Sequence, residues 1–170
     1  MFFVLGRIAA VLVLPALILS GCTVESMMST RAPKFVQIFP ENEPVPQGVT
    51  NPGGLNDLIG RYSATYHVPE SLIRRIIVRE SGYNAGARHG PYWGLMQIRY
   101  DTARSMGYNG SPSGLLSADT NLRYGVKYLA GAYLVAHGDP EKAVSFYASG
   151  YFYDARRLGL LEEVGLKRGK

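Results

Sequence analysis

The carboxylic acid Glu80 is the residue of this sequence whose position is best suited to chemistry. Ile73, Ile76 and Ile77 precede it at spacings that place all four residues on one face of a helix. Glu80 is therefore the last member of an apolar stripe, near a helix end where the dipole disfavours negative charge. Such a setting raises the pKa of a carboxyl group, and a carboxyl that stays protonated near neutral pH can donate a proton to a leaving group. The pattern predicts a general acid.

A simpler interpretation makes Glu80 an exposed acid paired with Arg75 or Arg79, a contact worth about 0.2–0.5 kcal/mol. Other reactive groups are sparse. The three histidines lack metal-ligand spacing, and no phosphate-binding or dinucleotide-binding glycine motif is present. Cys22 is the single cysteine, which excludes an intramolecular disulfide and a cysteine-based metal site. We therefore expect no metal and no cofactor.

The elements that must position Glu80 are predicted to be helices joined by glycine-rich loops. Apolar spacing, proline and capping residues indicate helices over residues 56–66, 69–81, 101–106, 117–137, 139–147 and 153–164. No convincing alternating strand is found, so the expected fold class is mainly α. Asp101, Asp119 and Asp139 stand at helix starts, where capping is the default role. None of them is an evident catalytic partner for Glu80, although the sequence leaves such a partner possible.

The first 54 of the 170 residues differ from the remainder. Residues 1–21 have the short cationic start and apolar run of a signal peptide, and Leu19-Ser20-Gly21-Cys22 resembles the lipobox of bacterial lipoproteins. This resemblance implies a lipid on Cys22, which would anchor the protein to a membrane. Residues 22–54 hold five of the ten prolines and are expected to form a tether. Residues 55–170 are the expected folded domain.

An address in the bacterial cell envelope follows from the lipobox. Thr23, rather than an aspartate, follows Cys22, which favours the outer membrane, with the domain facing the periplasm. The formal net charge of +5 is compatible with nucleic acid, anionic lipid or an anionic polymer. In the envelope an acidic wall polymer is the simplest partner, and we expect no nucleic acid.

Four segments in order carry a more specific signal: Glu80-Ser81, then Gly-Leu-Met-Gln-Ile at 94–98, then Asn121 to Leu129, then Phe146-Tyr147-Ala148-Ser149-Gly150. This set resembles the soluble-type lytic transglycosylases, whose lysozyme-like helical domain has a groove and is related to goose-type lysozyme. The resemblance covers nearly all of residues 55–150.

The resemblance implies a peptidoglycan lytic transglycosylase that cleaves the β-1,4 bond between MurNAc and GlcNAc and leaves 1,6-anhydroMurNAc ends. Glu80 would act first as acid and then as base. Ser81, Met96, Gln97 and Tyr147 would bind substrate, and Tyr147 is also expected to hydrogen-bond the carboxyl group. Peptidoglycan glycan strands are then the partner.

Several positions depart from the family pattern. Arg99-Tyr100 replaces the usual Met-Pro, Ala148 replaces an asparagine, and the bulky pair Tyr92-Trp93 precedes Gly94. Tyr92, Trp93 and Tyr151 are candidates for stacking on sugar rings. Two alternatives stay open: a hydrolytic muramidase of the goose-lysozyme type, and an inactive wall-binding lipoprotein that has kept the fold.

Overall fold

The computed structural model describes residues 54–166. The expected signal peptide, Cys22 and nearly all of the tether lie outside these residues. The described elements, in chain order, are α1 (Gly54–Tyr66), α2 (Glu70–Ser81), β1 (Arg88–His89), β2 (Tyr92–Trp93), β3 (Ile98–Arg99), α3 (Tyr100–Ser105), the 3-10 helix Pro112–Leu116, α4 (Ala118–Val135), α5 (Pro140–Ser149) and α6 (Phe152–Arg157).

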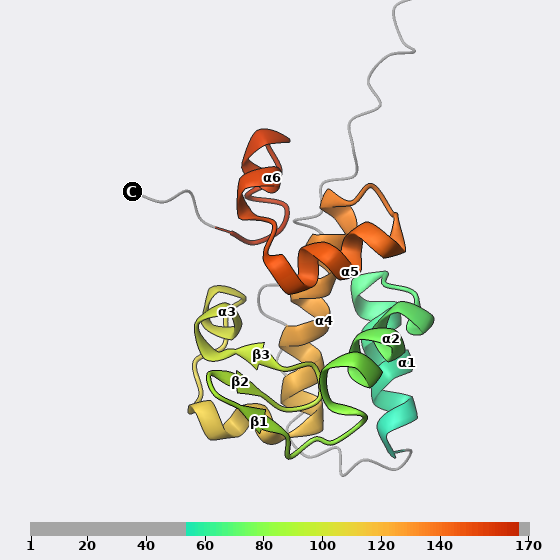
Figure 1. Cartoon of the computed structure of the whole chain (residues 1–170), viewed down its shortest axis with the longest axis vertical. Helices are drawn as coiled ribbons and strands as arrows, with labels where there is room; N and C mark the ends of the chain where they lie inside the picture. Colours follow the sequence, from blue (N-terminus) through green and yellow to red (C-terminus); the bar gives the residue numbers. More distant parts are fainter. Residues whose placement is uncertain (1–53, 167–170) are drawn as a thin grey trace, which may run out of the picture. The chain divides into compact units, whose positions relative to one another are not determined.

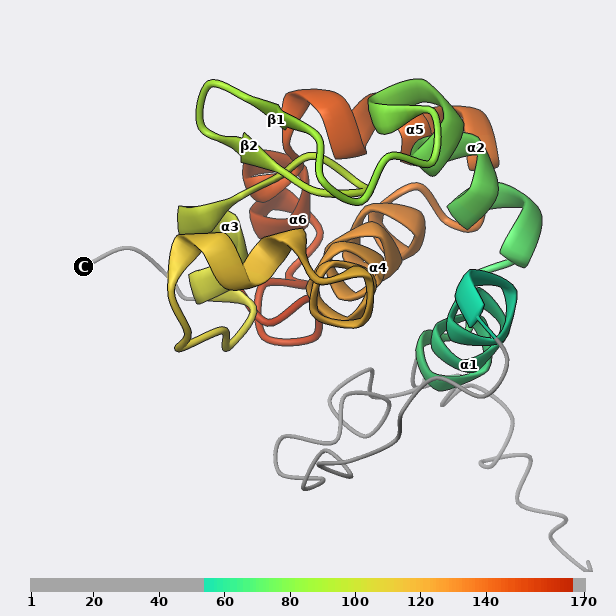
Figure 2. The ribbon, with the colours of Figure 1, turned by 90° about the horizontal axis from the view of Figure 1, so that it is seen from below.

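Helix α4 is the central element, and it packs against α1, α5, α3 and the 3-10 helix (Figure 1). Leu122, Val126 and Leu129 are completely buried along it, as their helical spacing predicts. Viewed along the axis of α4, the sheet with α3 lies on one side of this helix, and α1 lies on the other (Figure 2). The prediction of a mainly helical domain is confirmed. No helix in the described part of the chain is long and apolar enough to cross a membrane.

Helix α2 forms as predicted and delivers Glu80 to its last turn. Ile73, Ile76 and Ile77 are completely buried. Gly82 ends the helix in the left-handed conformation, with φ of 58°, and its N–H bonds the carbonyls of Ile77 and Val78. The buried stripe therefore fixes the direction in which Glu80 leaves the helix.

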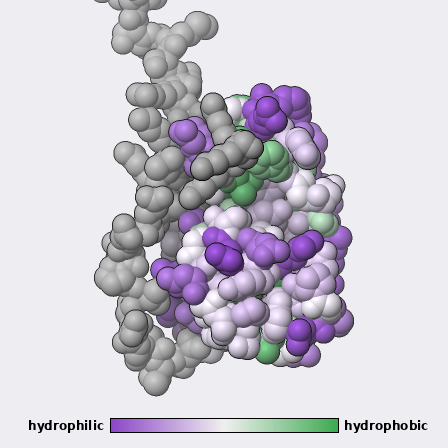
Figure 3. All heavy atoms as spheres, turned by 90° about the vertical axis from the view of Figure 1, so that its left-hand side faces the viewer, coloured by the Kyte–Doolittle hydropathy of each residue, from purple (hydrophilic) through white to green (hydrophobic). Residues whose placement is uncertain are grey.

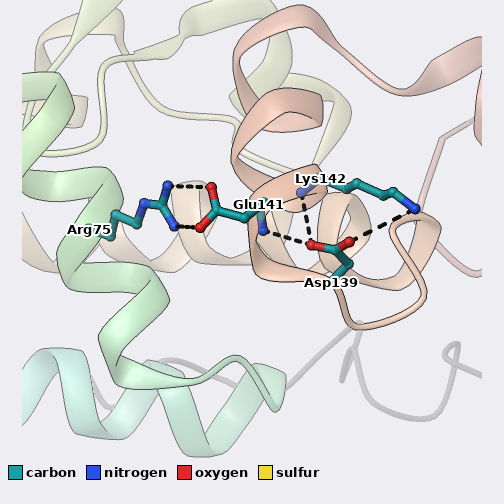
Figure 4. Close-up of polar contacts among 4 residues, drawn as sticks. All are labelled: Arg75, Asp139, Glu141 and Lys142. Carbon is teal, nitrogen blue, oxygen red and sulfur yellow. Dashed lines mark hydrogen bonds and ion pairs between the residues drawn. The ribbon is translucent and has the colours of Figure 1, made fainter.

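Helix α5 begins at the predicted cap. The Asp139 carboxylate accepts hydrogen bonds from the backbone N–H groups of Glu141 and Lys142, with Pro140 in the first turn (Figure 4). Arg75 of α2 reaches the Glu141 carboxylate through two nitrogens, one of them 2.7 Å from Oε2 (Figure 4). This bidentate pair joins α2 to α5. Arg75, one of the two arginines that the sequence offers as a partner of Glu80, is therefore paired with Glu141.

The other two capping predictions are wrong. The N-cap positions of α3 and α4 are Arg99 and Ser117, whose side chains make no capping hydrogen bond, and Asp101 and Asp119 both lie in first turns. Asp119 instead accepts a hydrogen bond of 3.0 Å from the Tyr62 hydroxyl of α1. A carboxylate in a first turn is still favoured by the helix dipole, which explains why acids are found there without capping.

Two further features differ from the expectation. Residues 88–99 form a three-stranded antiparallel sheet in the order β1-β2-β3, which the sequence did not reveal. Each strand has two residues, too few to show an alternating pattern. The last helix is also shorter than the predicted 153–164, because α6 ends at Arg157 and Gly159 then adopts a φ of 74°.

Candidate active site

Glu80 is partly buried at the end of α2, with its side chain 23% exposed. Burial raises the pKa of its carboxyl group above the ordinary value, and the charge of Arg79 opposes this shift. The Arg79 Nε lies 3.6 Å from Glu80 Oε1, and the Arg79 side chain is itself half exposed, so the attraction is screened by water. The carboxyl group therefore keeps its proton to a higher pH than a carboxyl group in water.

Ser81 ties the end of α2 to the neighbouring turn. Its hydroxyl lies 2.7 Å from the carbonyl oxygen of Leu95 and 3.3 Å from that of Ile77. The shorter contact crosses from the helix to the turn at residues 94–97. Ser81 thus fixes the position of the adjacent Glu80 relative to this turn.

The turn at residues 94–97 is held in place by Asn121 of α4, which is completely buried. Its Oδ1 accepts from the Met96 N–H at 2.8 Å, and its Nδ2 donates to the carbonyls of Trp93 at 2.7 Å and Leu115 at 2.8 Å. Gly94 has a φ of 68°, and a Cβ there would clash with Asn121 Nδ2 and with the Leu115 carbonyl. The position of Asn121 therefore requires a glycine at position 94.

Met96 corrects one expectation for the site. Its side chain is completely buried in the core, and its Sδ would lie 2.7 Å from a Cβ placed on Gly125. The thioether therefore supports the turn from behind and does not face a groove. What Met96 offers at the site is its backbone carbonyl, which accepts a 2.9 Å hydrogen bond from the Tyr147 hydroxyl.

Gln97 is also more structural than expected. It is buried with a φ of 46°, and its Nε2 donates to the carbonyls of Gly94 at 2.7 Å and Ala87 at 3.2 Å. Its Oε1 lies 2.8 Å from His89 Nδ1. Both amide hydrogens are thus committed to the hairpin, which leaves the second lone pair of the oxygen for a ligand.

Tyr147 lies beside Glu80 without forming the expected bond to it. Its hydroxyl proton is donated to the Met96 carbonyl. Burial raises the pKa of the Tyr147 hydroxyl well above its usual value, with the negative charge of Glu80 as the next cause. The two side chains are therefore close enough to interact electrostatically, and the phenol stays protonated.

A cleft of about 280 Å³ opens next to Tyr147. Its lining residues come from β2, β3, the start of α3 and the end of α5, and Tyr128 of α4 contributes to it. The lining residues are Tyr92, Gln97, Ile98, Arg99, Thr102, Tyr128, Tyr147, Ala148, Ser149 and Gly150. Among the described residues, Glu80 does not line this cleft but adjoins Tyr147, which does.

The family model described as the Transglycosylase SLT domain matches residues 57–160. The chain belongs to this family. The match spans both the carboxyl group of Glu80 and the cleft, and it carries lytic-transglycosylase-type cleavage of peptidoglycan as the general activity. It also agrees with the lysozyme-like helical architecture. No solved structure matches the chain significantly.

The three aromatic residues expected to stack on sugar rings differ in their exposure in this transglycosylase domain. Tyr92 lines the cleft and is 42% exposed, which suits stacking on a sugar ring. Trp93 is half-buried beneath the Arg88 guanidinium, 4.2 Å from the ring centre. Tyr151 is buried, and its hydroxyl bonds the Tyr128 carbonyl, so the prediction that it stacks on sugars is wrong.

The SLT domain shows no second carboxylate acting on Glu80. Among the described residues, the pKa of Glu80 responds to burial and to Arg79, not to another acid. Asp101 is strongly exposed, Asp119 binds Tyr62, and Asp139 caps α5. Residues 54–166 also contain no cluster of three or more His, Cys, Asp or Glu side chains able to hold a metal ion.

Sequence reasoning did not identify Arg99 and Thr102 as residues of the cleft. Arg99 departs from the family pattern, and the sequence around Thr102 carries no signal of a site. Their place in the cleft depends on β3 leading directly into α3, a turn of the chain that the sequence pattern did not predict.

Proposed function

We propose that this protein cleaves the β-1,4 bond between MurNAc and GlcNAc in peptidoglycan and leaves 1,6-anhydroMurNAc ends. The observation that carries the proposal is the part-buried carboxyl group of Glu80, with its raised pKa and no acid among the described residues that shifts it. A single carboxyl group suits a mechanism in which one residue acts as acid and then as base. Ordinary retaining and inverting glycosidases use two carboxyl groups at set separations.

The reaction begins with the proton of Glu80. The carboxyl group gives this proton to the oxygen that links the two sugars, and the bond from this oxygen to the muramic C1 breaks. Positive charge develops at C1, where the substrate's own N-acetyl group can stabilise it. The Glu80 carboxylate then takes the proton of the C6 hydroxyl group. The oxygen of this hydroxyl group forms the new bond to C1. Glu80 ends protonated, as it began, and no water is consumed.

The remaining site residues orient this exchange. We assign Ser81, Met96, Gln97 and Tyr147 to the substrate-binding region, with Ser81 and Met96 acting through the turn that they hold. Gln97 and Tyr147 both line the cleft. A glycan strand lying in the cleft would pass Tyr147 and bring its scissile bond to Glu80.

The decisive experiment compares wall digests of the wild type with those of Glu80→Gln by mass spectrometry. Glu80→Gln should release no product while remaining folded, whereas the matched control Glu70→Gln, an exposed acid on the same helix, should retain activity. Anhydro ends support the transglycosylase. Reducing ends would instead identify a hydrolytic muramidase of the goose-lysozyme type, and strand binding without turnover by the wild type would identify a wall-binding lipoprotein.

We further propose that the protein is exported and held in the bacterial cell envelope by a lipid on Cys22, with the outer membrane as its site. The support is the sequence pattern of residues 1–22. Acyl chains contribute about 0.8 kcal/mol per buried CH₂, so a multiply acylated cysteine holds the protein firmly. Cys22→Ser should move the protein from the membrane fraction to the soluble fraction, and unchanged fractionation would contradict the anchor.

A further inference from the structure

One residue gives the cleft a full charge. The side chains that line it are aromatic, aliphatic or uncharged polar groups, and Arg99 is the single charged member of this described set. A cation among neutral groups recognises anions, and the guanidinium fork fits a carboxylate with two parallel hydrogen bonds.

Arg99 is placed in the cleft by the sheet. It stands opposite Tyr92 in the β2–β3 register, and it is the residue from which α3 starts. Both members of this cross-strand pair line the cleft, so a stacking ring and a guanidinium lie side by side on one wall. The Arg99 side chain is 52% exposed, and a ligand in the cleft can therefore reach it.

The existing partner of Arg99 is weak. Asp101 Oδ2 lies 3.9 Å from an Arg99 nitrogen, and the Asp101 side chain is 81% exposed. An ion pair of this length and exposure contributes little and is readily exchanged for another carboxylate. Asp101 therefore competes with a ligand only modestly.

Two neighbouring arginines differ from Arg99 in their contacts. Arg88 lies over the Trp93 ring at 4.2 Å, and Arg104 lies 5.9 Å from the Tyr100 ring centre, and neither lines the cleft. On the side of the domain that carries α3, hydrophilic residues predominate, and the hydrophobic colour gathers higher up, at the level of α6 (Figure 3). The anion-binding potential of the cleft itself thus depends on Arg99.

We propose that Arg99 is a specificity residue that binds a carboxylate of the muramyl unit and so distinguishes peptidoglycan from neutral glycans. This inference rests on the proposed function. The carboxylate has two possible sources: the free lactyl group of an unsubstituted MurNAc, or the acidic residues of the stem peptide, whose attachment converts the lactyl carboxyl into an amide.

The test measures binding by calorimetry in the full chain carrying Glu80→Gln, so that no ligand is cleaved. Three glycans of equal length are used: neutral chitotetraose, a GlcNAc–MurNAc tetrasaccharide with free lactyl groups, and the same tetrasaccharide with stem peptides. Arg99→Ala, Arg99→Lys and Asp101→Asn are compared with the control Arg104→Ala, which removes a cation outside the cleft.

Arg99→Ala should weaken binding of one anionic glycan about fivefold, the upper range for a half-exposed ion pair, and leave chitotetraose unchanged. The anionic glycan that responds identifies the source of the carboxylate. Arg99→Lys should recover part of the loss, and Asp101→Asn should tighten the same ligand about twofold. The effect should shrink as salt is added.

Equal effects of Arg99→Ala on neutral and anionic glycans, or no effect on any of them, would overturn the inference and leave the proposed function standing. Failure of the Glu80→Gln chain to bind any of the three glycans would overturn both. A loss with Arg104→Ala as large as that with Arg99→Ala would also refute the inference, because general charge would then explain the preference.

Discussion

Replacing Asn121 by alanine tests whether the site depends on a buried polar support. The side chain satisfies three backbone groups of segments that surround the cleft: the Met96 N–H and the carbonyls of Trp93 and Leu115. Asn121 is completely buried, so water does not replace these bonds without a rearrangement of the turn. Asn121→Ala therefore leaves three groups to be satisfied elsewhere or to remain unpaired.

The expected cost follows from these bonds. A buried group left without a partner costs about 1–3 kcal/mol. Partial relaxation and water entry lower the total, and we expect the free energy of unfolding to fall by about 3–4 kcal/mol. Domains of this size have about 5–15 kcal/mol of stability, so the variant should still fold.

Urea unfolding followed by fluorescence measures this change, because Trp93 is the only tryptophan and its carbonyl is one of the three backbone groups that Asn121 binds. Asn109→Ala, the same substitution at an exposed loop position, is the matched control and should change stability by less than about 0.5 kcal/mol. Asn121→Asp should also be strongly destabilising, since its second oxygen would face two carbonyls. A loss below about 1 kcal/mol in Asn121→Ala would refute the claim that this side chain holds the turn.

Three further predictions concern the proposed acid Glu80 and its neighbour Tyr147. Because the pKa of Glu80 is raised, its protonated form persists above pH 4.5, and kcat/KM should fall as pH rises through that pKa; a profile that rises there would contradict the acid role. The raised pKa also means that the ionised carboxyl destabilises the folded state above that pKa, so Glu80→Gln should unfold at the same or a higher urea concentration than the wild type at pH 7, with the difference vanishing at low pH. Tyr147→Phe leaves the Met96 carbonyl without its donor and should cost about 1–2 kcal/mol, whereas the exposed control Tyr153→Phe should cost almost nothing in the same assay.

The helices that carry the core could be predicted because their sequences repeat a physical constraint over many residues. The buried spacing of Leu122, Val126 and Leu129 recurs along α4, and the Asp139-Pro140 pair combines a cap with a first-turn proline. Such signals depend on neighbouring residues only, so they can be read from the sequence without knowledge of the tertiary structure. The helix containing Glu80 was predictable for the same reason.

The sheet and the end of the last helix could not be predicted from local signals. Two-residue strands show no period, and their pairing depends on the turn at Gly90, where φ is 58°. Tyr151 is a second example, since its ring is buried against α4 at Gly131, where a Cβ would clash with its hydroxyl. A tyrosine that follows one glycine between two helices does not indicate from the sequence that its ring packs on α4.

The site shows the same division between local and tertiary information. The position of Glu80 at the end of an apolar stripe could be read from the sequence, but the directions of Met96 and Gln97 could not. The Met96 side chain is oriented by Asn121 and Gly125 of α4. The Gln97 side chain is oriented in part by His89 of β1. A residue type alone does not tell whether an amide binds a sugar or a backbone.

The family-like residues around Glu80 are mostly buried and hydrogen-bonded to one another, and this has a consequence for specificity. Asn121, Met96 and Gln97 hold the turn, so substituting them disturbs the fold before it alters the choice of substrate. Two of the departures from the family pattern, Arg99 and Tyr92, line the cleft, and both side chains are substantially exposed. Substrate preference can therefore change at these positions while the support of the acid stays intact. Variants of Arg99 and Tyr92 should therefore alter which glycan is bound and leave the stability of the domain nearly unchanged.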